Sequence, residues 1–516
     1  MRDSNRTAQH ITLEEPLLFE RSQPGRVGYS LPPMGVPETP VEDLVPDHLR
    51  RDRVEGLPEL SEFDVVRHFN RLAQWNYCID RGIYPLGSCT MKYNPRLNEV
   101  IARWTAFTEA HPYLPDEFVQ GCLAIQWHLE CYLSEITGMD AVTLQPAAGA
   151  HGELTGLLLI RACLEDRGEK RTRILVPDSA HGTNPASAAL GGFEVVHLKS
   201  DERGLLSPST LRAAMSQDVA ALMITNPNTL GLFEEDILEI ADVLHEGGAF
   251  LYMDGANMNA FLGIARPGDM GVDVLHLNLH KTFSTPHGGG GPGSGPVCVR
   301  EHLAPYLPVP RVAREGDRYR RIWDSPKSIG RVKAFEGHFG VHVRALAYIL
   351  SLGRDHLRDI AVHAVLNANY LMARLKPYYH LPYDRRVMHE VVFNDRRQNP
   401  TGVTTMDIAK RLIDYGLHPP TVYFPLIVPG ALMIEPTETE SLEELDRFVE
   451  AMTQIAREAA EQPEVLRSAP QRGAFRRFDE VEAARHPILR WSPQGFPPAW
   501  KRVSRGSEDV PIRDEK

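Results

Sequence analysis

Short apolar segments alternate with helical segments between residues 173 and 300, and this alternation constrains the fold more than any other feature. It predicts strands at Arg173–Pro177, Phe193–Leu198, Val219–Thr225, Phe250–Asp254, Val274–Leu279 and Val297–Arg300. It predicts helices between them at Pro185–Leu190, Ser207–Met215 and Glu235–His245. Strands joined through helices form parallel pairs, so we expect an α/β fold in which helices cover both faces of a mostly parallel sheet.

Polar residues follow four of the predicted strands at the point where each strand ends. They are Asp178–Pro185, Thr225–Thr229, Asp254–Asn257 and the pair His280-Lys281. Ligands of parallel sheets bind at the carboxyl ends of the strands, so we expect these segments to surround one site. Each segment could also serve only the fold, as a turn or a hydrogen-bonded core residue, but their recurrence favours a ligand site.

Lys281 lies at the end of a predicted core strand and precedes four consecutive glycines, Gly288–Gly291. An amine in such a position can lose its charge by desolvation and become a nucleophile towards a carbonyl carbon. The glycines predict a loop whose backbone can approach a ligand closely. On this stretch alone, a Lys281 side chain that reaches solvent is the structural alternative.

A run of small residues, Ala147–Ala150, precedes an apolar helix predicted at residues 154–164. Bare N–H groups at the positive end of a helix form an anion site that suits a phosphate. The run matches neither the Walker motif nor the dinucleotide-binding motif. Tight packing is its structural alternative.

Together these residues suit pyridoxal 5'-phosphate. We expect Lys281 to bind the aldehyde covalently and Asp254 to pair with the pyridine nitrogen. His181 would stack on one face of the ring, and Ala256 would cover the other. The phosphate would be held by the amides of Ala148, Gly149 and Ala150. His280 would either bond the phosphate or transfer protons.

Composition and charge narrow the class of protein. The 516 residues carry a formal net charge of -12, which argues against nucleic acid or an anionic membrane as the main partner. The six cysteines form no C-x-x-C pair, and no long apolar run could span a bilayer, so we expect a cytoplasmic protein. A metal site at His276 and His280 is disfavoured because the glutamate of H-E-x-x-H is missing.

Composition also suggests where the chain divides. A proline-rich and charged start predicts an extended arm, and long helices after residue 340 predict a second domain. We expect an N-terminal arm at 1–60, a helical segment at 61–135, a cofactor-binding large domain at 136–340, a small domain at 341–462 and a C-terminal tail at 463–516. The tail contains Trp491 and Trp500, and we assign it no function.

Six motifs between Tyr84 and Glu440 resemble those of the glycine decarboxylase P-protein family. They are Pro85–Lys92, Gln145–Glu153, Ala180–Ala186, Thr225–Gly231, Asn278–Phe283 and Met433–Glu440. The resemblance implies a fold-type I, aspartate aminotransferase-like large domain, a smaller α+β C-terminal domain and an extended N-terminal arm. It also adds Thr183, Thr225 and Asn228 to the expected cofactor contacts.

The resemblance implies a reaction and partners. The chain is similar to the lysine-bearing half of the family, subunit 2 of the two-subunit bacterial form, which implies a subunit 1 and a heterotetramer with two of each. The implied enzyme is a glycine dehydrogenase (aminomethyl-transferring, decarboxylating), a pyridoxal phosphate-dependent oxidoreductase. It decarboxylates glycine and transfers the aminomethyl group to the lipoyl arm of the H-protein in the glycine cleavage system. The alternatives are another fold-type I decarboxylase or aminotransferase, and a non-catalytic half that only binds a partner.

The lipoyl arm would need a channel to the site. We expect the loop Ser88-Cys89-Thr90 and the glycines Gly288–Gly291 to form its walls, with Cys89 as a structural thiol. Arg331 and Arg344 are candidates for binding the glycine carboxylate.

Overall fold

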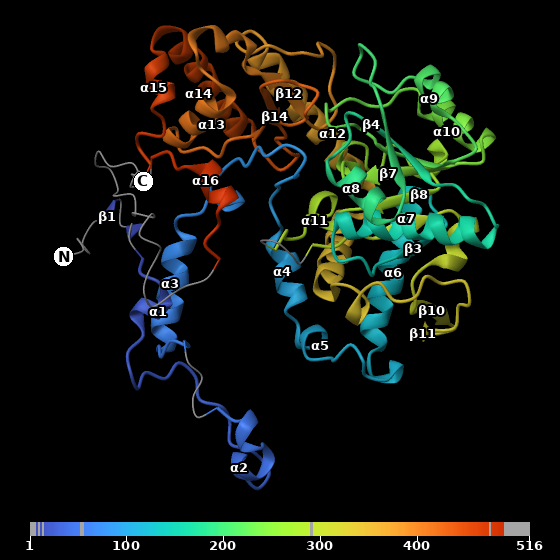
Figure 1. The fold of residues 1–516 in the computed structure, drawn as a ribbon, viewed down its shortest axis with the longest axis vertical. Helices are drawn as coiled ribbons and strands as arrows, with labels where there is room; N and C mark the ends of the chain where they lie inside the picture. The colour runs from blue at the N-terminus through green and yellow to red at the C-terminus, as the bar shows by residue number, and fades with distance from the viewer. Residues whose placement is uncertain are drawn as a thin grey trace. The chain divides into compact units, whose positions relative to one another are not determined.

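The computed structural model describes residues 7–8, 11–12, 15–51, 56–288, 293–473 and 476–489. The chain divides into two compact units, one made of residues 82–471 and the other of residues 1–81 and 472–516. Within the described residues, no helix is long and apolar enough to cross a membrane. Figure 1 shows the helices and strands with their labels. The larger unit contains every predicted site residue.

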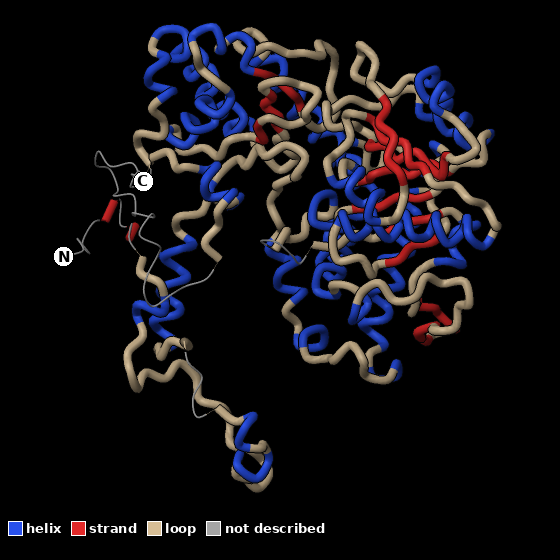
Figure 2. The backbone as a smooth tube through the Cα atoms, in the orientation of Figure 1, coloured by secondary structure: helices blue, strands red, loops and turns tan. Residues whose placement is uncertain are grey.

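A seven-stranded sheet forms the centre of the larger unit, with the strand order β3-β9-β8-β7-β6-β4-β5 (Figure 2). Its strands are β3 Ala141–Thr143, β4 Arg173–Pro177, β5 Glu194–Leu198, β6 Val219–Thr225, β7 Phe250–Gly255, β8 Val274–Leu277 and β9 Val297–Val299. The pairs between β5, β4, β6, β7 and β8 are parallel, and β9 runs antiparallel to both β8 and β3. The predicted mostly parallel sheet is therefore confirmed.

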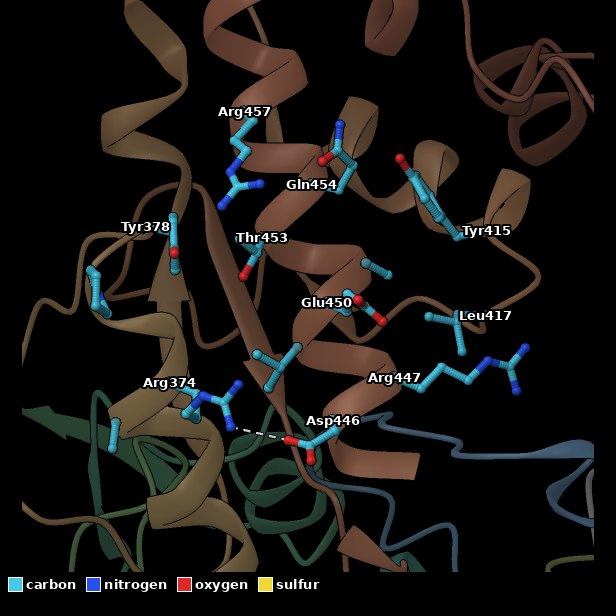
Figure 3. Close-up of a pocket in the computed structure, with 14 residues that line it drawn as sticks. Arg374, Tyr378, Tyr415, Leu417, Asp446, Arg447, Glu450, Thr453, Gln454 and Arg457 are labelled. Carbon is cyan, nitrogen blue, oxygen red and sulfur yellow. Dashed lines mark hydrogen bonds and ion pairs between the residues drawn. The ribbon is translucent and has the colours of Figure 1, made fainter. Parts of the chain in front are cut away.

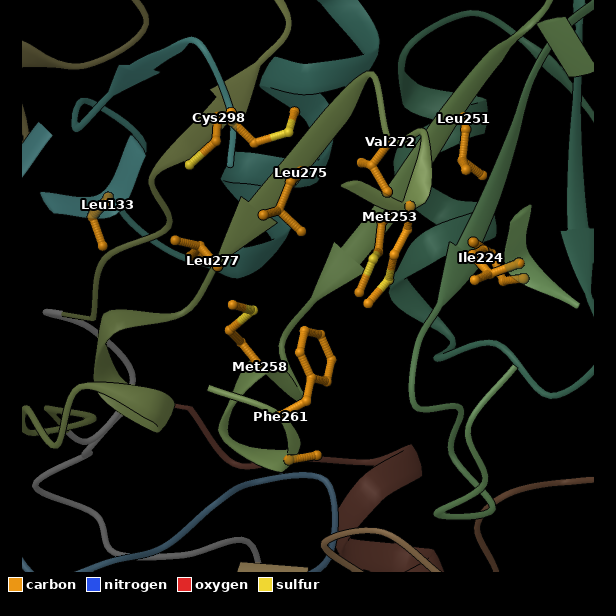
Figure 4. Packing of buried hydrophobic residues seen from close by; sticks show 14 of the residues in the cluster. Leu133, Ile224, Leu251, Met253, Met258, Phe261, Val272, Leu275, Leu277 and Cys298 are labelled. Carbon is orange, nitrogen blue, oxygen red and sulfur yellow. The ribbon is translucent and has the colours of Figure 1, made fainter. Parts of the chain in front are cut away.

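Alternate residues of the central strands enter different cores. Leu251 and Met253 of β7 pack in one buried cluster with residues of β8 and β6 (Figure 4). Phe250 and Tyr252 of β7 pack in a second cluster. The helices of these two layers are α6 Gln120–Thr137, α7 Gly149–Asp166, α8 Thr183–Leu190, α9 Pro208–Ala214 and α10 Ile237–Glu246. Because both faces are covered, the central strands β6, β7 and β8 are fully buried and mostly apolar, which is why the sequence shows long apolar runs there.

A third cluster is the core of the C-terminal part of this unit. Its three-stranded antiparallel sheet has the order β12-β14-β13. Its elements are α12 Phe339–Leu375, β12 Val391–Asn394, α13 Thr405–Asp414, β13 Thr421–Val422, β14 Ala431–Ile434, α14 Leu442–Glu461 and α15 Pro463–Arg467. Gly353, with a φ of 65°, interrupts α12 and divides it into two helical segments. Shorter elements of the larger unit are α4 Arg96–Ala102, α5 Thr105–Thr108, α11 Leu279–Thr282, β10 Arg311–Glu315 and β11 Arg318–Ile322.

The smaller unit contains short elements and one longer helix. They are β1 Thr7–Ala8, β2 Ile11–Thr12, α1 Leu18–Arg21, α2 Val41–Leu44, α3 Glu62–Ala73 and α16 Glu480–Arg485. Ser61 caps α3 through a hydrogen bond from the Asp64 amide, as the sequence predicts. The buried carboxylate of Glu15 forms an ion pair with Arg71 of the same helix.

Candidate active site

A cavity of about 170 Å³ lies at the carboxyl edge of the seven-stranded sheet. It is lined by Ser88, Gly149, Ala150, Glu153, His181, Thr183, Thr225, Thr229, Asp254, Ala256, Asn257, His276, Asn278, His280 and Lys281. Of the residues predicted to bind the cofactor or act in catalysis, all but Ala148 and Asn228 line this cavity. The strand ends therefore meet where the topology predicts.

Lys281 does not lie at the end of a strand, and this part of the prediction was wrong. Strand β8 ends at Leu277, and Lys281 lies in the one-turn helix α11. The alternation of Leu277 and Leu279 resembles a longer strand because Leu279 remains buried in the helix. The Nζ atom of Lys281 donates a hydrogen bond to the carbonyl oxygen of Ser88 at 2.8 Å, which keeps the amine at the cavity.

Asp254 is a buried carboxylate at the end of β7. Its Oδ1 accepts a hydrogen bond from the Ala256 amide at 2.9 Å and lies 3.2 Å from Nε2 of His276. Asn184 donates to its Oδ2 at 3.3 Å. Burial alone would raise the pKa of Asp254, but His276, the Ala256 amide and Lys281 together hold the pKa below its ordinary value. Asp254 is therefore an anion, as a partner for a protonated ring nitrogen must be.

His181 offers a neutral aromatic ring to the cavity. Burial, followed by the nearby Lys281, lowers the pKa of its imidazole. The Thr183 amide donates a hydrogen bond to Nδ1 of His181 at 3.3 Å. The Thr183 hydroxyl donates in turn to the buried carboxylate of Glu153 at 2.7 Å. An uncharged ring fixed at one edge can stack against another ring without desolvating a charge.

The first turn of α7 forms one end of the cavity. A Cβ atom at Gly149 would lie 2.4 Å from Oδ1 of Asn278, so a larger residue there would require the Asn278 side chain to move. No side chain caps this helix start. Among the described residues, the buried atoms Oδ1 of Asn278, Oγ1 of Thr225 and Oδ1 of Asn257 have no hydrogen-bond partner. Bare amides and unsatisfied polar atoms around one cavity fit a ligand with a phosphate and further polar groups, as pyridoxal phosphate has.

His280 also lines the cavity and is neutral. Burial, with a contribution from His287, lowers the pKa of His280 to about 3. The Ser294 amide donates to its Nδ1 at 3.2 Å, so Nε2 carries the hydrogen. The His280 ring is therefore a hydrogen-bond donor at neutral pH, whether to a phosphate or to a reacting group.

Two of the predicted contacts lie elsewhere. Asn228 uses its Nδ2 to bond the Gly204 carbonyl and Glu234, both at 2.9 Å, and its Oδ1 accepts from two amides, those of Leu230 and Leu232. Asn228 therefore uses its side-chain hydrogen bonds to hold the turn after β6. Ala148 is the N-cap residue of α7 and does not line the cavity.

The expected channel and carboxylate contacts have mixed outcomes. Ser88 lines the cavity, and burial raises the pKa of the neighbouring Cys89, so Cys89 is a thiol rather than a thiolate. Gly289, Gly290 and Gly291 of the glycine loop lie outside the described residues. Arg344 pairs with Glu99 through two hydrogen bonds of 2.8 and 2.9 Å, and neither it nor Arg331 lines the cavity.

Sequence reasoning missed several residues of the site. They are Glu153, Thr229, Asn257, His276 and Asn278; all but His276 lie within the motifs or strand ends already singled out, and His276 lies inside β8. His276 carries a signal that was available, because a histidine in an otherwise apolar strand must find a polar partner. It finds two, Asp254 and the Tyr252 hydroxyl, the latter at 2.9 Å.

A wider cavity of about 930 Å³ lies against α14 and the ends of α12 and α13 (Figure 3). It is lined by residues such as Arg374, Tyr415 and Arg457, and Arg374 is paired with Asp446 at 3.1 Å. None of the strand-end residues reaches it. The smaller cavity is therefore the candidate active site, because Lys281, Asp254 and His181 line it.

Comparisons with known proteins agree with this geometry. The chain matches the family model of the glycine cleavage system P-protein over residues 34–318 and that of the glycine dehydrogenase C-terminal domain over residues 360–471. It is 58% identical to the probable glycine dehydrogenase (decarboxylating) subunit 2 of Halalkalibacterium halodurans, covering 93% of this chain and 98% of that protein. It is 57% identical to the protein of the same name from Bacillus velezensis, with the same coverage.

Solved structures share the fold. An inhibitor-bound glycine decarboxylase (P-protein) of the glycine cleavage system superposes with a TM-score of 0.68 at 20% identity, covering 80% of this chain and 94% of that one. The cysteine desulfurase CsdA from Escherichia coli superposes with a TM-score of 0.57 at 15% identity, covering 75% and 97%. The fold is therefore that of the fold-type I pyridoxal phosphate enzymes, and the chain belongs to the glycine cleavage system P-protein family.

Proposed function

We propose that this chain binds pyridoxal 5'-phosphate on Lys281, decarboxylates glycine and transfers the remaining aminomethyl group to the lipoyl arm of an H-protein. The observation that carries the proposal is the single cavity that joins Lys281, an ionised Asp254 and the bare start of α7. The relatives that match over nearly their whole length carry the name of this enzyme's subunit 2.

When bound, the cofactor supplies an electron sink for the electron pair released with carbon dioxide. Lys281 would hold the cofactor covalently, and its bond to the Ser88 carbonyl fixes the amine within reach. Asp254 would keep a proton on the ring nitrogen, because it is buried, anionic and already held by two fixed donors. Fixed charges in a buried site stabilise developing charge without reorganisation.

The remaining residues would orient and shield the ring. His181 would stack on one face, and Ala256 would cover the other. Gly149, Ala150, Thr183 and Thr225 would hold the phosphate end. The narrow cavity favours an amino acid without a side chain. His280, neutral with its hydrogen on Nε2, would donate to the phosphate end or move a proton near Lys281.

We also propose that the chain works with a separate subunit 1, two copies of each, and with the lipoylated H-protein. The name "subunit 2" of the relatives supports the first of these. Because a cysteine desulfurase shares the fold, another reaction at the same type of site is the alternative function.

The test is glycine-dependent release of carbon dioxide by the purified chain, with and without subunit 1, in the presence of lipoylated H-protein. We expect release only with H-protein present, stimulation by subunit 1 and none from alanine or serine. Release from bulkier amino acids, or sulfur release from cysteine, would contradict the proposal.

A further inference from the structure

Two glutamates outside the cavity lining stand directly opposite each other near Lys281. Glu390 precedes β12 and Glu435 follows β14, and the register of these antiparallel strands, Val391 with Ile434, places them as the next pair. Both side chains are fully buried. A carboxylate oxygen of each, with a ring nitrogen of His389, lies within 4.8 Å of the others. Like charges opposite each other in a buried pair repel strongly.

The two glutamates hold the loop that receives the bond from Lys281. The Ser88 amide donates to Oε2 of Glu390 at 2.8 Å. The Thr90 amide and hydroxyl donate to the two oxygens of Glu435 at 3.0 and 2.6 Å. Ser88 and Thr90 have φ values of 65° and 51°, a region that residues with side chains seldom adopt. The carboxylates therefore hold a strained loop against Lys281, whose amine donates to the Ser88 carbonyl.

The surrounding charges do not balance two anions. The titratable groups around the pair are Lys281, Cys89 and His389. Burial raises the pKa of the Cys89 thiol and lowers the pKa of His389 to about 3, so both are neutral. Lys281 is the one cation among these three groups, and it also stabilises the Asp254 anion. Two ionised glutamates would leave an unpaired buried charge, which proteins avoid by binding a proton.

The hydrogen bonds differ between the two partners. Both oxygens of Glu435 accept from Thr90, and Asn259 adds a weaker contact at 3.4 Å, so Glu435 is surrounded by donors. Glu390 accepts one hydrogen bond, and its Oε1 has no hydrogen-bond partner among the described residues, although Nε2 of the neutral His389 lies 3.6 Å away. Burial raises the pKa of both carboxyls, and the neighbouring Glu435 raises that of Glu390 further.

We propose that Glu390 and Glu435 are positioning residues that hold one proton between them, carried by Glu390, while Glu435 is the buried anion that balances Lys281. They act on the reaction through the Ser88–Thr90 loop rather than by touching the substrate. The role in catalysis rests on the proposed function, whereas the protonation state does not.

The first test is the infrared carbonyl band of a protonated carboxyl, measured at neutral pH on the purified full chain. Glu390→Gln should remove one such band, and Glu435→Gln should leave it in place. Glu440→Gln is the matched control: its pKa is raised to about 7, and it does not contact the loop. No band lost in Glu390→Gln, or the same band lost in Glu435→Gln, would overturn the proposal. Because this measurement needs no cofactor, it stands even if glycine decarboxylation fails.

The second test compares the same variants in the reconstituted enzyme. Glutamine resembles a protonated glutamate, so Glu390→Gln should keep kcat/KM within about threefold. Glu435→Gln places an amide against the donors of Thr90 and removes the anion near Lys281, and should lower kcat/KM roughly ten- to a hundredfold. It should also shift the pH dependence of the bound-cofactor absorbance to lower pH, which a purely structural role would not do. Equal losses in both variants, or an unmoved profile in Glu435→Gln, would contradict the assignment. If Glu390→Gln fails to fold, retention of the band in Glu435→Gln tests the same point.

Discussion

Burial and hydrogen bonding shift the pKa of the Asp254 carboxyl in opposite directions. Burial favours the neutral acid, while His276, the Ala256 amide and Lys281 favour the anion and prevail. Asp254 therefore stays ionised although it is buried away from water. The same balance makes His181 and His280 neutral, since burial dominates for both.

Replacing Asp254 by asparagine should lower the turnover rate far more than the binding of the cofactor. The asparagine side chain would keep the size of the aspartate but lose the charge that holds a proton on the ring nitrogen. We expect Asp254→Asn to lower kcat roughly a hundredfold or more, with a much smaller loss of cofactor occupancy. Asp166→Asn, at a half-exposed pair with Lys327, is the control. Equal losses of rate and occupancy would show that Asp254 serves binding only.

The sequence predicted the identity of the key side chains better than their partners. Asp254 lies at the end of β7, and His181 and Lys281 each follow a buried strand by four residues, so the strand pattern singles out all three. The Glu153 carboxylate and the Ser88 carbonyl could not be placed, because their contacts join segments that lie far apart in the chain: Thr183 is 30 residues from Glu153, and Lys281 is 193 from Ser88. Such pairings depend on tertiary packing, which a local pattern does not contain.

Among the strands of the large sheet, six were predicted to within a few residues, and β3 was not. Strand β3, Ala141–Thr143, is too short to show a period of two. The boundary between β8 and α11 was misplaced because Leu279 is buried in either conformation. The start of α7 was predicted as a helix start, but the contact of Gly149 with Asn278 was not.

A methyl group at the start of α7 should test this element. The Cβ of Gly149→Ala would lie 2.4 Å from Oδ1 of Asn278, inside the cavity. We expect cofactor affinity to fall at least about tenfold, as loss of one or two good hydrogen bonds would cause. Gly182→Ala, at the N-cap of α8 with nothing within 4 Å of its Cβ, should bind normally. Equal effects of both substitutions on cofactor binding would argue against the α7 site.

Helix α12 carries a buried histidine that should make stability depend on pH. Burial lowers the pKa of His342 to about 3 in the folded chain, against about 6.5 when unfolded. Between these values the unfolded state binds more protons, so this histidine contributes stability above pH 6.5 that is lost as pH falls. We expect the free energy of unfolding of His342→Leu, relative to the unsubstituted chain, to rise by about 1.4 kcal/mol per unit as pH falls below 6.5.

Denaturant unfolding of the two proteins across roughly pH 4 to 7 measures this difference, on the assumption of about one proton per histidine. A difference that stays constant with pH would mean that His342 is protonated in the folded protein.

At the scale of the whole molecule, the match to the Halalkalibacterium halodurans relative covers 93% of this chain, so it includes residues of both units. The α/β fold class could be predicted from the alternation of strands and helices alone, because two strands joined through a helix usually lie parallel in one sheet. The division into residues 82–471 and a unit that joins both ends of the chain could not. Composition shows an arm and a tail, but not that they belong together.

The most direct test of the account is the site at which pyridoxal 5'-phosphate becomes attached. The chain should be incubated with the cofactor, reduced with borohydride and mapped by peptide mass. We expect the label on Lys281 and no label in Lys281→Arg, while Lys92, a buried lysine bonded to the Thr282 carbonyl at 2.8 Å, stays unmodified. A label on Lys92, or none at all in a folded chain, would contradict the account.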